Sequence, residues 1–473
     1  MTHFSSLKQI FGIALLCGTV LIAKGGESRD YLLSNLASSW NPGDELGGVQ
    51  SSCDLNRQWW STFEDPMLDS LIAIGERNNY DVAIAARRID ISRQALRQTE
   101  SSYYPQIGLS LGWQRDRQSG RLSGRSGQPV TSSYFNGTAN MSWEVDVFGK
   151  IRAQAKRGKA QVKVSAAEYD GALVALDAEI ASTYINLLVY RTQLAVAINH
   201  SENQKHILDI TETRHKTGLV SKLDVAQAST LYYSTIASIP LLEASIEASY
   251  NSLAVLLGTT KDNLPEGLYA DCVLPDHYPM PALGAPIDLL RRRPDIVAAE
   301  RSIEMAAASL GIARSAYFPS LSIEASVGTE AHSFGDLFSG SSFSYSIAPT
   351  LSWTLFDGLS RRAATLEARQ ELENEVENYN LTVITAIEEV RTAIARYKAT
   401  QEYISRTAKV VENSEEAVRL SLDQYKQGLT GFYNVAEAQL NYLTYQNSLV
   451  SARGNALTAL IDLYKALGGG YSL

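Results

Sequence analysis

The chain has 473 residues, of which 45% are hydrophobic and 20% are charged, and its formal net charge is −9. Ordinary apolar content excludes an intrinsically disordered chain, and three cysteines are too few for a disulfide scaffold. The negative charge gives no indication of nucleic-acid binding. No apolar run reaches the ~18–20 residues of a membrane-spanning helix. At ~150 residues per domain the length suggests about three domains, although repeat proteins deviate from this rule.

The first 25 residues are arranged like a secretory signal peptide. An almost wholly apolar stretch, 10–23, follows Lys8 and is too short for a stable membrane anchor. Ala23 and Gly25 are small residues at the −3 and −1 positions of a cleavage before Gly26. The sequence therefore predicts an exported chain, and a buried N-terminal helix is the alternative interpretation.

The three cysteines allow two modifications. Cys17 is a candidate for lipidation, although Leu16 precedes it where lipoprotein signals have a small residue. Cys53 and Cys272 would remain after cleavage, and an oxidising compartment would make them a candidate disulfide pair. The sequence alone does not place their two side chains together.

The most informative feature is an internal duplication. An Ala-rich segment that begins at Asp81 ends at Tyr103-Tyr104-Pro105, and 214 residues later a second one begins at Asp295 and ends at Tyr317-Phe318-Pro319. Three further pairs share a shift of 210 residues: Ser142-Trp143 with Ser352-Trp353, Lys216-Thr217-Gly218-Leu219 with Lys426-Gln427-Gly428-Leu429, and Leu257-Gly258 with Leu467-Gly468. The predicted organisation is a signal peptide (1–25), an N-terminal arm (26–78), a first repeat (79–258), a linking or equatorial segment (259–292), a second repeat (293–468) and a C-terminal tail (469–473).

Prolines are unevenly distributed along the chain. None lies between Pro129 and Pro240, and none follows Pro349. Because proline breaks helix interiors, these tracts favour very long helices. Each repeat is predicted to contain a helix, two strands, a long helix and a shorter helix, with the first helix ending before Pro105 or Pro319.

Apolar residues recur every seven positions in the long tracts, which predicts coiled-coil packing between helices. The four series are Ala166, Leu173, Ile180, Leu187, Leu194 and Leu208; Val225, Tyr232, Ile239, Ile246 and Leu253; Val376, Val383, Val390, Tyr397, Ile404, Val411 and Val418; and Val435, Tyr442, Leu449, Ala456 and Leu463. A helix over 361–425 would be roughly 100 Å long. Gly218 and Gly428 would mark the turns at the tips of two hairpins, and Pro240 is expected to kink one returning helix.

Apolar and polar side chains alternate after the first helix of each repeat, which predicts strands. The apolar positions are Ile107, Leu109, Leu111, Trp113; Phe135, Ala139, Met141, Trp143, Val145; Leu321, Ile323, Ala325, Val327; and Phe343, Tyr345, Ile347, Leu351, Trp353, Leu355. Such segments suit a transmembrane barrel, but a soluble sandwich with one wet face fits the alternation equally well. Pro349 inside the last strand is an objection. Because lipid does not tolerate open sheet edges, four strands require several chains, and three chains would supply twelve strands.

We find no catalytic motif, no phosphate-binding loop and no nucleophile elbow in the sequence, which argues against an enzyme and against a cofactor. We expect no metal site: His200 and His206 are six residues apart, so they do not share a helix face, and we interpret them as solvated. In the run Arg291-Arg292-Arg293-Pro294-Asp295, we interpret Asp295 as a helix cap rather than as part of an anion site.

Several motifs resemble the TolC-like outer-membrane factors of bacterial tripartite efflux systems, in the branch related to the Pseudomonas multidrug outer-membrane channel lipoprotein. The matching stretches are Trp59-Trp60-Ser61-Thr62-Phe63-Glu64-Asp65-Pro66, Asp288-Leu289-Leu290-Arg291-Arg292-Arg293-Pro294-Asp295-Ile296, Ala316-Tyr317-Phe318-Pro319-Ser320 and Leu463-Tyr464-Lys465-Ala466-Leu467-Gly468-Gly469-Gly470. Their order and the doubled layout also agree, so the resemblance covers nearly everything after residue 50.

This resemblance implies a mainly α fold with a membrane β-barrel. Three chains would form a homotrimer whose twelve-stranded barrel in the outer membrane is continuous with a periplasmic α-helical barrel. The implied function is a passive duct for small molecules such as drugs or toxic compounds, and the implied partners are a periplasmic adaptor and an inner-membrane pump. The first alternative is a periplasmic coiled-coil adaptor, which usually has one hairpin and soluble strands. A secreted structural coiled coil is the second alternative.

The resemblance also assigns a periplasmic gate to the helix tips of the second repeat. The matching residues are Tyr433, where the family often has an aliphatic residue, and Glu437, where it often has an aspartate. Asp224 in the corresponding tip of the first repeat would tether neighbouring helices. Carboxylates brought to the axis of a trimer would favour cationic or neutral solutes, whereas the structural alternative for Glu437 is a solvated helix residue.

Overall fold

The computed structural model describes residues 57–121, 129–270, 274 and 292–469. The signal peptide, Cys17, Cys53 and Cys272 lie outside these residues, so cleavage, lipidation and the disulfide stay predictions. The chain divides into two compact units. The first, called here the hairpin unit, comprises Met1–Ala86, Ala167–Val297 and Asn380–Leu473, and the second, the sheet unit, comprises Arg87–Ala166 and Ala298–Tyr379.

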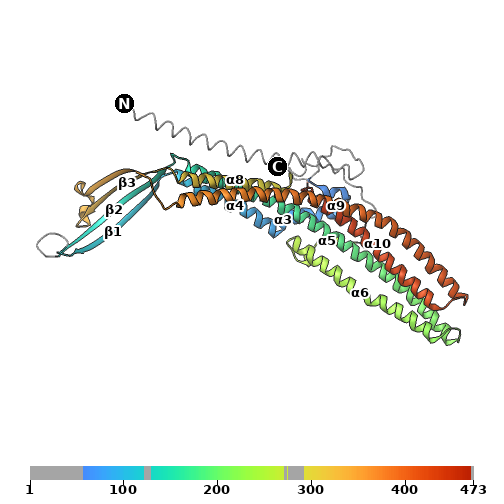
Figure 1. Ribbon diagram of the computed structural model, residues 1–473. Helices are drawn as coiled ribbons and strands as arrows, with labels where there is room; N and C mark the ends of the chain where they lie inside the picture. Colours follow the sequence, from blue (N-terminus) through green and yellow to red (C-terminus); the bar gives the residue numbers. More distant parts are fainter. Residues whose placement is uncertain (1–56, 122–128, 271–273, 275–291, 470–473) are drawn as a thin grey trace, which may run out of the picture. The chain divides into compact units, whose positions relative to one another are not determined.

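The main elements follow one order twice (Figure 1). They are α4 (Tyr80–Glu100), β1 (Gln106–Gln118), β2 (Val130–Val145), α5 (Lys150–Lys216) and α6 (Lys222–Leu256), and then α8 (Pro294–Ser315), β3 (Ser320–Ala331), β4 (Phe343–Ser352), α9 (Ser360–Lys426) and α10 (Phe432–Ala466). The helix α3 (Pro66–Asn78) and short 3-10 turns at η1 (Trp59–Phe63), η2 (Ser101–Tyr103), η3 (Lys261–Asn263), η4 (Glu266–Tyr269), η5 (Gly335–Phe338) and η6 (Gly340–Ser342) complete the described elements. Both α5 and α9 contain 67 residues, and both α6 and α10 contain 35.

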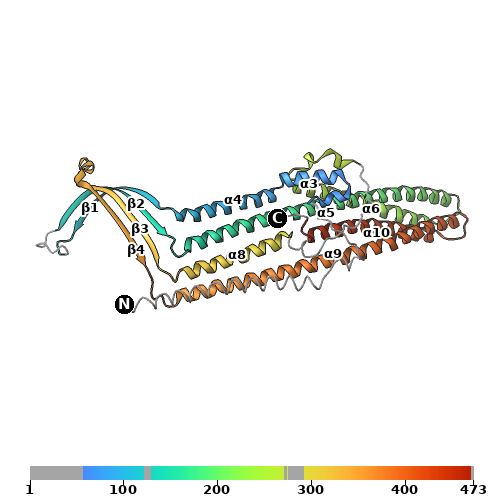
Figure 2. The same cartoon turned by 90° about the horizontal axis from the view of Figure 1, so that it is seen from above.

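The described strands of the sheet unit form one antiparallel sheet in the order β1-β2-β3-β4 (Figure 2). Odd-numbered residues pair with odd-numbered residues along all three strand pairs, for example Trp113 with Phe135 and Val327 with Tyr345. Since paired residues share a face, the apolar positions of all four strands lie on one face of the sheet. Pro349 is accommodated in β4, an edge strand of this sheet. Alternation predicted a strand through Leu355, but β4 ends at Ser352.

The apolar core of the hairpin unit gathers α3, α5, α6 and α10. Asp65 caps α3 by accepting hydrogen bonds from the backbone N–H groups of Met67 and Leu68, at 2.8 and 3.3 Å. Leu68, Leu71 and Ile72 on the same helix are fully buried, and Trp59 stacks on Tyr464 with ring centroids 5.1 Å apart. This core also contains Ile180, Ala181, Tyr184, Ile185, Leu187, Leu188, Leu253, Leu257, Leu460 and Ile461.

The seven-residue series form the inner faces of the long helices. Every position in the four predicted series is buried or half-buried, as coiled-coil packing requires. The expectation that no stretch is long and apolar enough to cross a membrane is wrong for α5, which contains one such 18-residue stretch among the described helices. Because 67% of this stretch is buried inside the chain, it has the burial of a core helix. The helix α6 continues through Pro240.

Gly258 and Gly218 both follow helices in the left-handed conformation, with φ of +65° and +79°. A Cβ atom at Gly258 would lie 2.2 Å from the backbone oxygen of Asn78, whereas nothing lies within 4 Å of a Cβ at Gly218. We therefore expect Gly218→Ala to lower the free energy of unfolding by about 1–2 kcal/mol. Gly258→Ala should lower the free energy of unfolding clearly more than Gly218→Ala does, and thermal unfolding measures both variants. Equal losses of stability would contradict the close approach of the Asn78 backbone to Gly258.

Candidate functional site

The tip of the α5–α6 hairpin is closed by its own side chains. After Gly218 reverses the chain, the N–H of Leu219 donates to the carbonyl oxygen of Arg214 at 2.9 Å. Ser221 and Asp224 then form a complete capping box: the N–H of Asp224 donates to Ser221 Oγ at 3.2 Å, and the N–H of Ser221 donates to Asp224 Oδ2 at 2.9 Å. The predicted tether residue Asp224 thus caps its own helix within the chain.

The tip of the α9–α10 hairpin has the same turn but a weaker cap. Gly428 has a φ of +75°, and the N–H of Leu429 donates to the carbonyl oxygen of Gln424 at 3.0 Å. Gly431 stands at the N-cap of α10, where no side chain accepts a hydrogen bond. Because a side-chain cap typically contributes about 1 kcal/mol, the first turn of α10 depends on packing more than the first turn of α6 does.

An apolar cluster packs the two tips together inside the hairpin unit. Its buried members are Ile207, Leu208, Ala228, Tyr425, Phe432 and Val435. Phe432 and Val435 are fully buried, and the Tyr425 ring meets Phe432 edge to face at 5.3 Å. The Arg214 guanidinium lies 5.2 Å from the centre of the Tyr425 ring. These contacts hold the buried face of α10 in place at the first turn of the helix.

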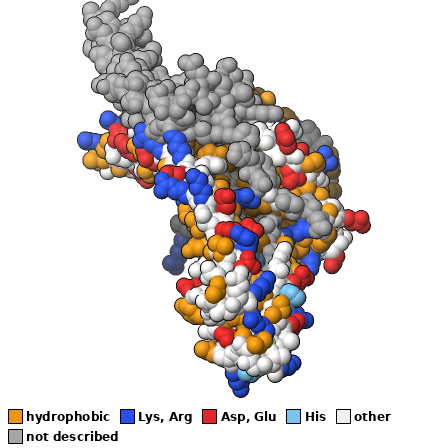
Figure 3. All heavy atoms as spheres, turned by 90° about the vertical axis from the view of Figure 1, so that its right-hand side faces the viewer, with side chains coloured by type: hydrophobic (Ala, Val, Ile, Leu, Met, Phe, Trp, Pro, Cys, Tyr) orange, Lys and Arg blue, Asp and Glu red, His pale blue; other side chains and the backbone are white. Residues whose placement is uncertain are grey.

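Both predicted gate residues lie at the start of α10, on the face opposite to Phe432 and Val435. Tyr433 is 61% exposed, and Glu437, one helical turn later, is also exposed. Figure 3 views the molecule from the side on which these tips lie in Figure 1, and acidic, basic and apolar side chains are interspersed on this face. The described residues thus place the phenol and the carboxylate together, free to meet other chains or solutes.

The polar face of the sheet carries acidic groups and no basic ones. Its even-numbered strand residues include Asp116, Glu144, Glu324 and Glu330, and none is lysine or arginine. Asp116 accepts hydrogen bonds from Gln114, and Glu144 pairs with Lys150 Nζ at 3.0 Å. Glu324 and Glu330 are exposed and have no ion-pair partner among the residues that the structure describes. This face would attract cations.

The strand-to-helix junctions of the sheet unit are built alike in both halves. The indole N–H of Trp143 donates to the carbonyl oxygen of Tyr103 at 3.0 Å, and that of Trp353 donates to Tyr317 at 3.1 Å. Each indole thereby satisfies a backbone carbonyl near the end of the preceding helix.

An aspartate follows each junction and caps the long helix. Burial raises the pKa of Asp146, but hydrogen bonds from the N–H groups of Arg152 and Ile151 outweigh burial and lower it. The Arg361 guanidinium and N–H likewise lower the pKa of Asp357. Both caps therefore stabilise the fold at neutral pH and lose this contribution only as the pH falls through the lowered pKa.

Arg293 belongs to the basic run for which the sequence favoured a structural role over an anion site, but its own contacts were not predicted. Its side chain is 9% exposed and donates to Asp295 at 2.7 Å, to Glu389 at 2.7 Å and to the carbonyl oxygen of Ala466 at 2.6 Å. Burial lowers the pKa of this guanidinium, but Asp295 and Glu389 outweigh burial and raise it above its ordinary value. Arg293 thus joins the start of α8, the middle of α9 and the end of α10. Asp295 forms an ion pair with Arg293 and also accepts a hydrogen bond from the N–H of Ile296.

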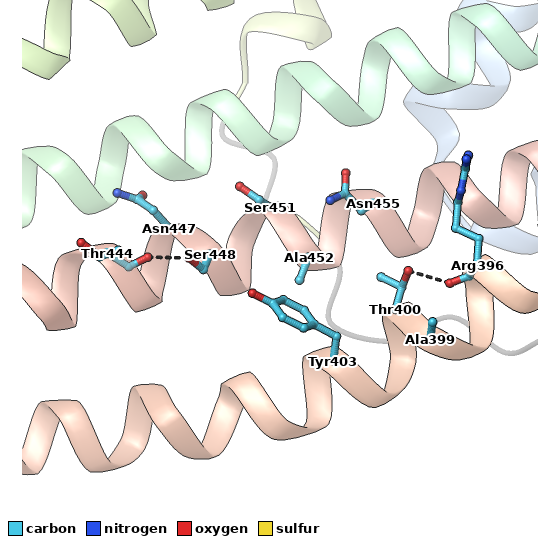
Figure 4. A pocket seen from close by; sticks show the side chains of 10 residues that line it. All are labelled: Arg396, Ala399, Thr400, Tyr403, Thr444, Asn447, Ser448, Ser451, Ala452 and Asn455. Atoms are coloured by element: carbon cyan, nitrogen blue, oxygen red, sulfur yellow. Dashed lines mark hydrogen bonds between the residues drawn. The ribbon is translucent and has the colours of Figure 1, made fainter.

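A groove of about 780 Å³ lies between α9 and α10 (Figure 4). Alanine, serine and threonine side chains line it together with Arg396, Tyr403, Asn447 and Asn455. The hydroxyls of Thr400 and Ser448 donate to backbone oxygens of their own helices. Tyr403 points into the groove from α9. The lining contains no arrangement of nucleophile, base and acid.

The described histidines do not form a metal site, since no group of three metal-ligating side chains occurs among the described residues. The interpretation of His200 as solvated is wrong: it is 9% exposed, and its Nε2 lies 2.7 Å from Gln446 Oε1. The His200 ring also lies next to α10, with its centroid 5.1 Å from that of the Tyr442 ring. His206 is exposed, as expected.

Comparison with known proteins identifies relatives over nearly the whole chain. The outer membrane efflux protein model matches residues 72–259 and again residues 285–469. The pyoverdine export outer membrane protein OpmQ of Pseudomonas aeruginosa is 30% identical over 468 residues, covering 97% of this chain and 97% of that protein. The probable efflux pump outer membrane protein TtgC of Pseudomonas putida is 28% identical over 443 residues, covering 92% and 90%.

The fold is also similar to a solved channel. The structure of the outer-membrane channel OprN superposes with a TM-score of 0.82 at 28% identity, over 89% of this chain and 95% of that one.

Proposed function

Because the chain belongs to the outer membrane efflux protein family, we propose that three copies assemble into one passive duct. The protein is an outer-membrane channel component of a tripartite efflux system and extends into the periplasm. In the proposed trimer, twelve strands close a barrel in the outer membrane, and the hairpins wall a periplasmic tunnel. The two repeats, 79–258 and 293–468, would each contribute one hairpin and two strands.

The register of the sheet is the observation that carries this proposal. One face bears the apolar side chains of all four strands and the other bears polar ones, as a barrel with lipid outside and water inside requires. The outer edges of β1 and β4 have no partner strand among the described residues. Hydrocarbon does not tolerate unpaired strand edges, so β1 of one copy would pair with β4 of the next.

The assembly can be tested by extracting the protein from outer membranes with detergent and measuring its native mass. A detergent-dependent trimer that forms channels in planar bilayers is the expected result. A freely soluble monomer without conductance would contradict the proposal.

The gate would lie at the tips of the α9–α10 hairpins. Three copies of Tyr433 and Glu437 would narrow the periplasmic end, and Asp224 of a neighbouring tip would help to hold it closed. The exposed positions of both gate side chains support this assignment.

Removing the free carboxylates of the polar face should weaken cation selectivity. The variant Glu324→Gln with Glu330→Gln would remove six negative charges from the barrel interior of a trimer, and the permeability ratio of K⁺ to Cl⁻ should fall. Reversal potentials under a KCl gradient measure this ratio. Glu266→Gln, an exposed carboxylate on η4, is the control for charge loss elsewhere. An unchanged ratio in the double variant would place these residues outside the conduction path.

The adaptor alternative is not favoured, because the relatives are outer-membrane proteins matched over most of their length. We propose that the cargo consists of small molecules delivered by an inner-membrane pump through a periplasmic adaptor. OpmQ is named for pyoverdine export, and a comparably small organic cargo is proposed for this chain.

A further inference from the structure

We propose that Arg115 and Arg117 bind the phosphate groups of a phosphorylated glycolipid in the outer leaflet of the membrane. Both residues are in β1, where Arg115 pairs with Ser133 and Arg117 pairs with Thr131. Their odd positions continue the series Ile107, Leu109, Leu111 and Trp113. The two guanidinium groups therefore extend from the apolar face of the sheet, at the end of its lipid-facing stripe.

Aromatic residues define the depth at which these arginines lie. Trp113 is opposite Phe135, and the Phe135 ring packs edge to face on Phe334 at 5.8 Å. Aromatic residues on the lipid-facing side of a barrel mark the boundary between hydrocarbon and headgroups. Arg115 follows Trp113 by two residues, roughly 7 Å along a strand. Arg115 and Arg117 thus reach the headgroup layer rather than the hydrocarbon.

Chain direction assigns this end of β1 to the outside of the cell, a step that rests on the proposed function. The strand begins just after α4, and the tunnel helices extend into the periplasm, so β1 runs outward from Gln106 to Gln118. The outer leaflet of a bacterial outer membrane contains glycolipids that carry phosphate groups. Arginine is the side chain best suited to bind phosphate, because its planar fork donates two parallel hydrogen bonds.

Nothing in the described part of the chain neutralises these two charges. Arg115 and Arg117 are exposed and form no ion pair with any described residue, unlike Arg93, Arg152 and Arg361 of the same unit. The nearby carboxylate of Asp116 lies on the polar face, where Gln114 donates to it. Two unneutralised guanidinium groups in the headgroup layer favour binding of a nearby anion, and this layer supplies phosphate.

Native mass spectrometry of the detergent-solubilised protein can measure this binding with bisphosphorylated lipid A as the probe. We expect wild-type protein to retain lipid A, and Arg115→Gln with Arg117→Gln to bind it about tenfold more weakly for each guanidinium removed. Arg88→Gln, an exposed arginine on α4 with no ion-pair partner among the described residues, is the matched control and should bind like wild type. Arg115→Lys with Arg117→Lys should recover part of the affinity.

Two further arms identify the ligand. Dephosphorylated lipid should bind weakly to every form, and inorganic pyrophosphate should not displace lipid A at equal concentration. Equal lipid A binding by wild type and the double Gln variant, equal binding of dephosphorylated lipid, or tight binding of pyrophosphate alone would overturn the inference. The oligomer mass and bilayer conductance of the same samples test the proposed function separately, since the double variant should remain a conducting trimer.

Discussion

Replacing Tyr433 and Glu437 together with alanine is expected to raise the single-channel conductance several-fold in planar bilayers. Both side chains project from the same exposed face of α10. Phe432 and Val435 on the other face are buried and hold the helix in place. Truncation therefore removes bulk and charge from the tip without removing the packing that positions it. In a trimer the variant would lose three phenol rings and three carboxylates at the narrow end of the tunnel.

The chain contains a matched control for this experiment. Leu223 and Gln227 occupy the positions of α6 that correspond to Tyr433 and Glu437 in α10, and Leu223 is 65% exposed. Leu223→Ala with Gln227→Ala should change conductance little if the constriction belongs to the second repeat. Glu437→Gln alone should lower the preference for cations while leaving most of the constriction, because it removes charge but little volume. An unchanged current in the double Tyr433 and Glu437 variant would make the gate assignment wrong.

Features that depend on a repeating pattern could be predicted from the sequence. Alternation with a period of two located the strands and their apolar face, because successive side chains of a strand point to opposite faces of the sheet. Seven-residue series located the buried faces of the long helices, and Gly218 and Gly428 lie at the turns where a positive φ favours glycine. Trp353 was placed inside a strand, but its indole N–H bonds to Tyr317 after β4 has ended.

Buried positions that carry polar side chains could not be predicted from the hydrophobic pattern. One series in α5 recurs every seven residues and is buried throughout, yet two of its three members are polar: Ala197, Gln204 and Thr211. Neither polar atom of the Gln204 amide has a hydrogen-bond partner in the described part of the chain. A buried polar layer of this kind weakens helix packing locally, because unsatisfied amides lose their solvation.

The contacts of Arg293 could not be predicted from the sequence either. Among the variants of this cluster, removal of the guanidinium should produce the largest loss of stability. Arg293→Met keeps much of the aliphatic stem but removes hydrogen bonds to Asp295, Glu389 and the Ala466 carbonyl oxygen. We expect the free energy of unfolding to fall by about 2–4 kcal/mol. The estimate lies below the full cost of breaking a buried pair, because the two carboxylates are 47% and 50% exposed and can be rehydrated.

Three variants separate the charge of Arg293 from its geometry. Arg293→Lys keeps the charge but not the planar fork, so its loss should be intermediate. Asp295→Asn and Glu389→Gln should each cost less, about 1 kcal/mol or below, since half-exposed carboxylates contribute little. Thermal unfolding of the detergent-solubilised protein measures all of them, with Arg88→Met as a control for loss of an exposed arginine. If Arg293→Met unfolds at the wild-type temperature, the guanidinium does not join the three helices.

Gly468 provides an independent test of the same junction. This residue follows α10 with a φ of +86°, and a Cβ atom there would lie 3.2 Å from both Cα and Cγ of Arg293. Gly468→Ala should therefore strain the backbone and push on the arginine at once, whereas Gly428→Ala, which has a similar φ and open space around it, adds only the backbone strain. In the Arg293→Met variant, the Cβ atom added by Gly468→Ala would still crowd the Cγ atom of residue 293. The guanidinium hydrogen bonds that this crowding disturbs would already be absent. The two substitutions together should then cost less than the sum of their separate losses, and strict additivity would show that Gly468 does not act through Arg293.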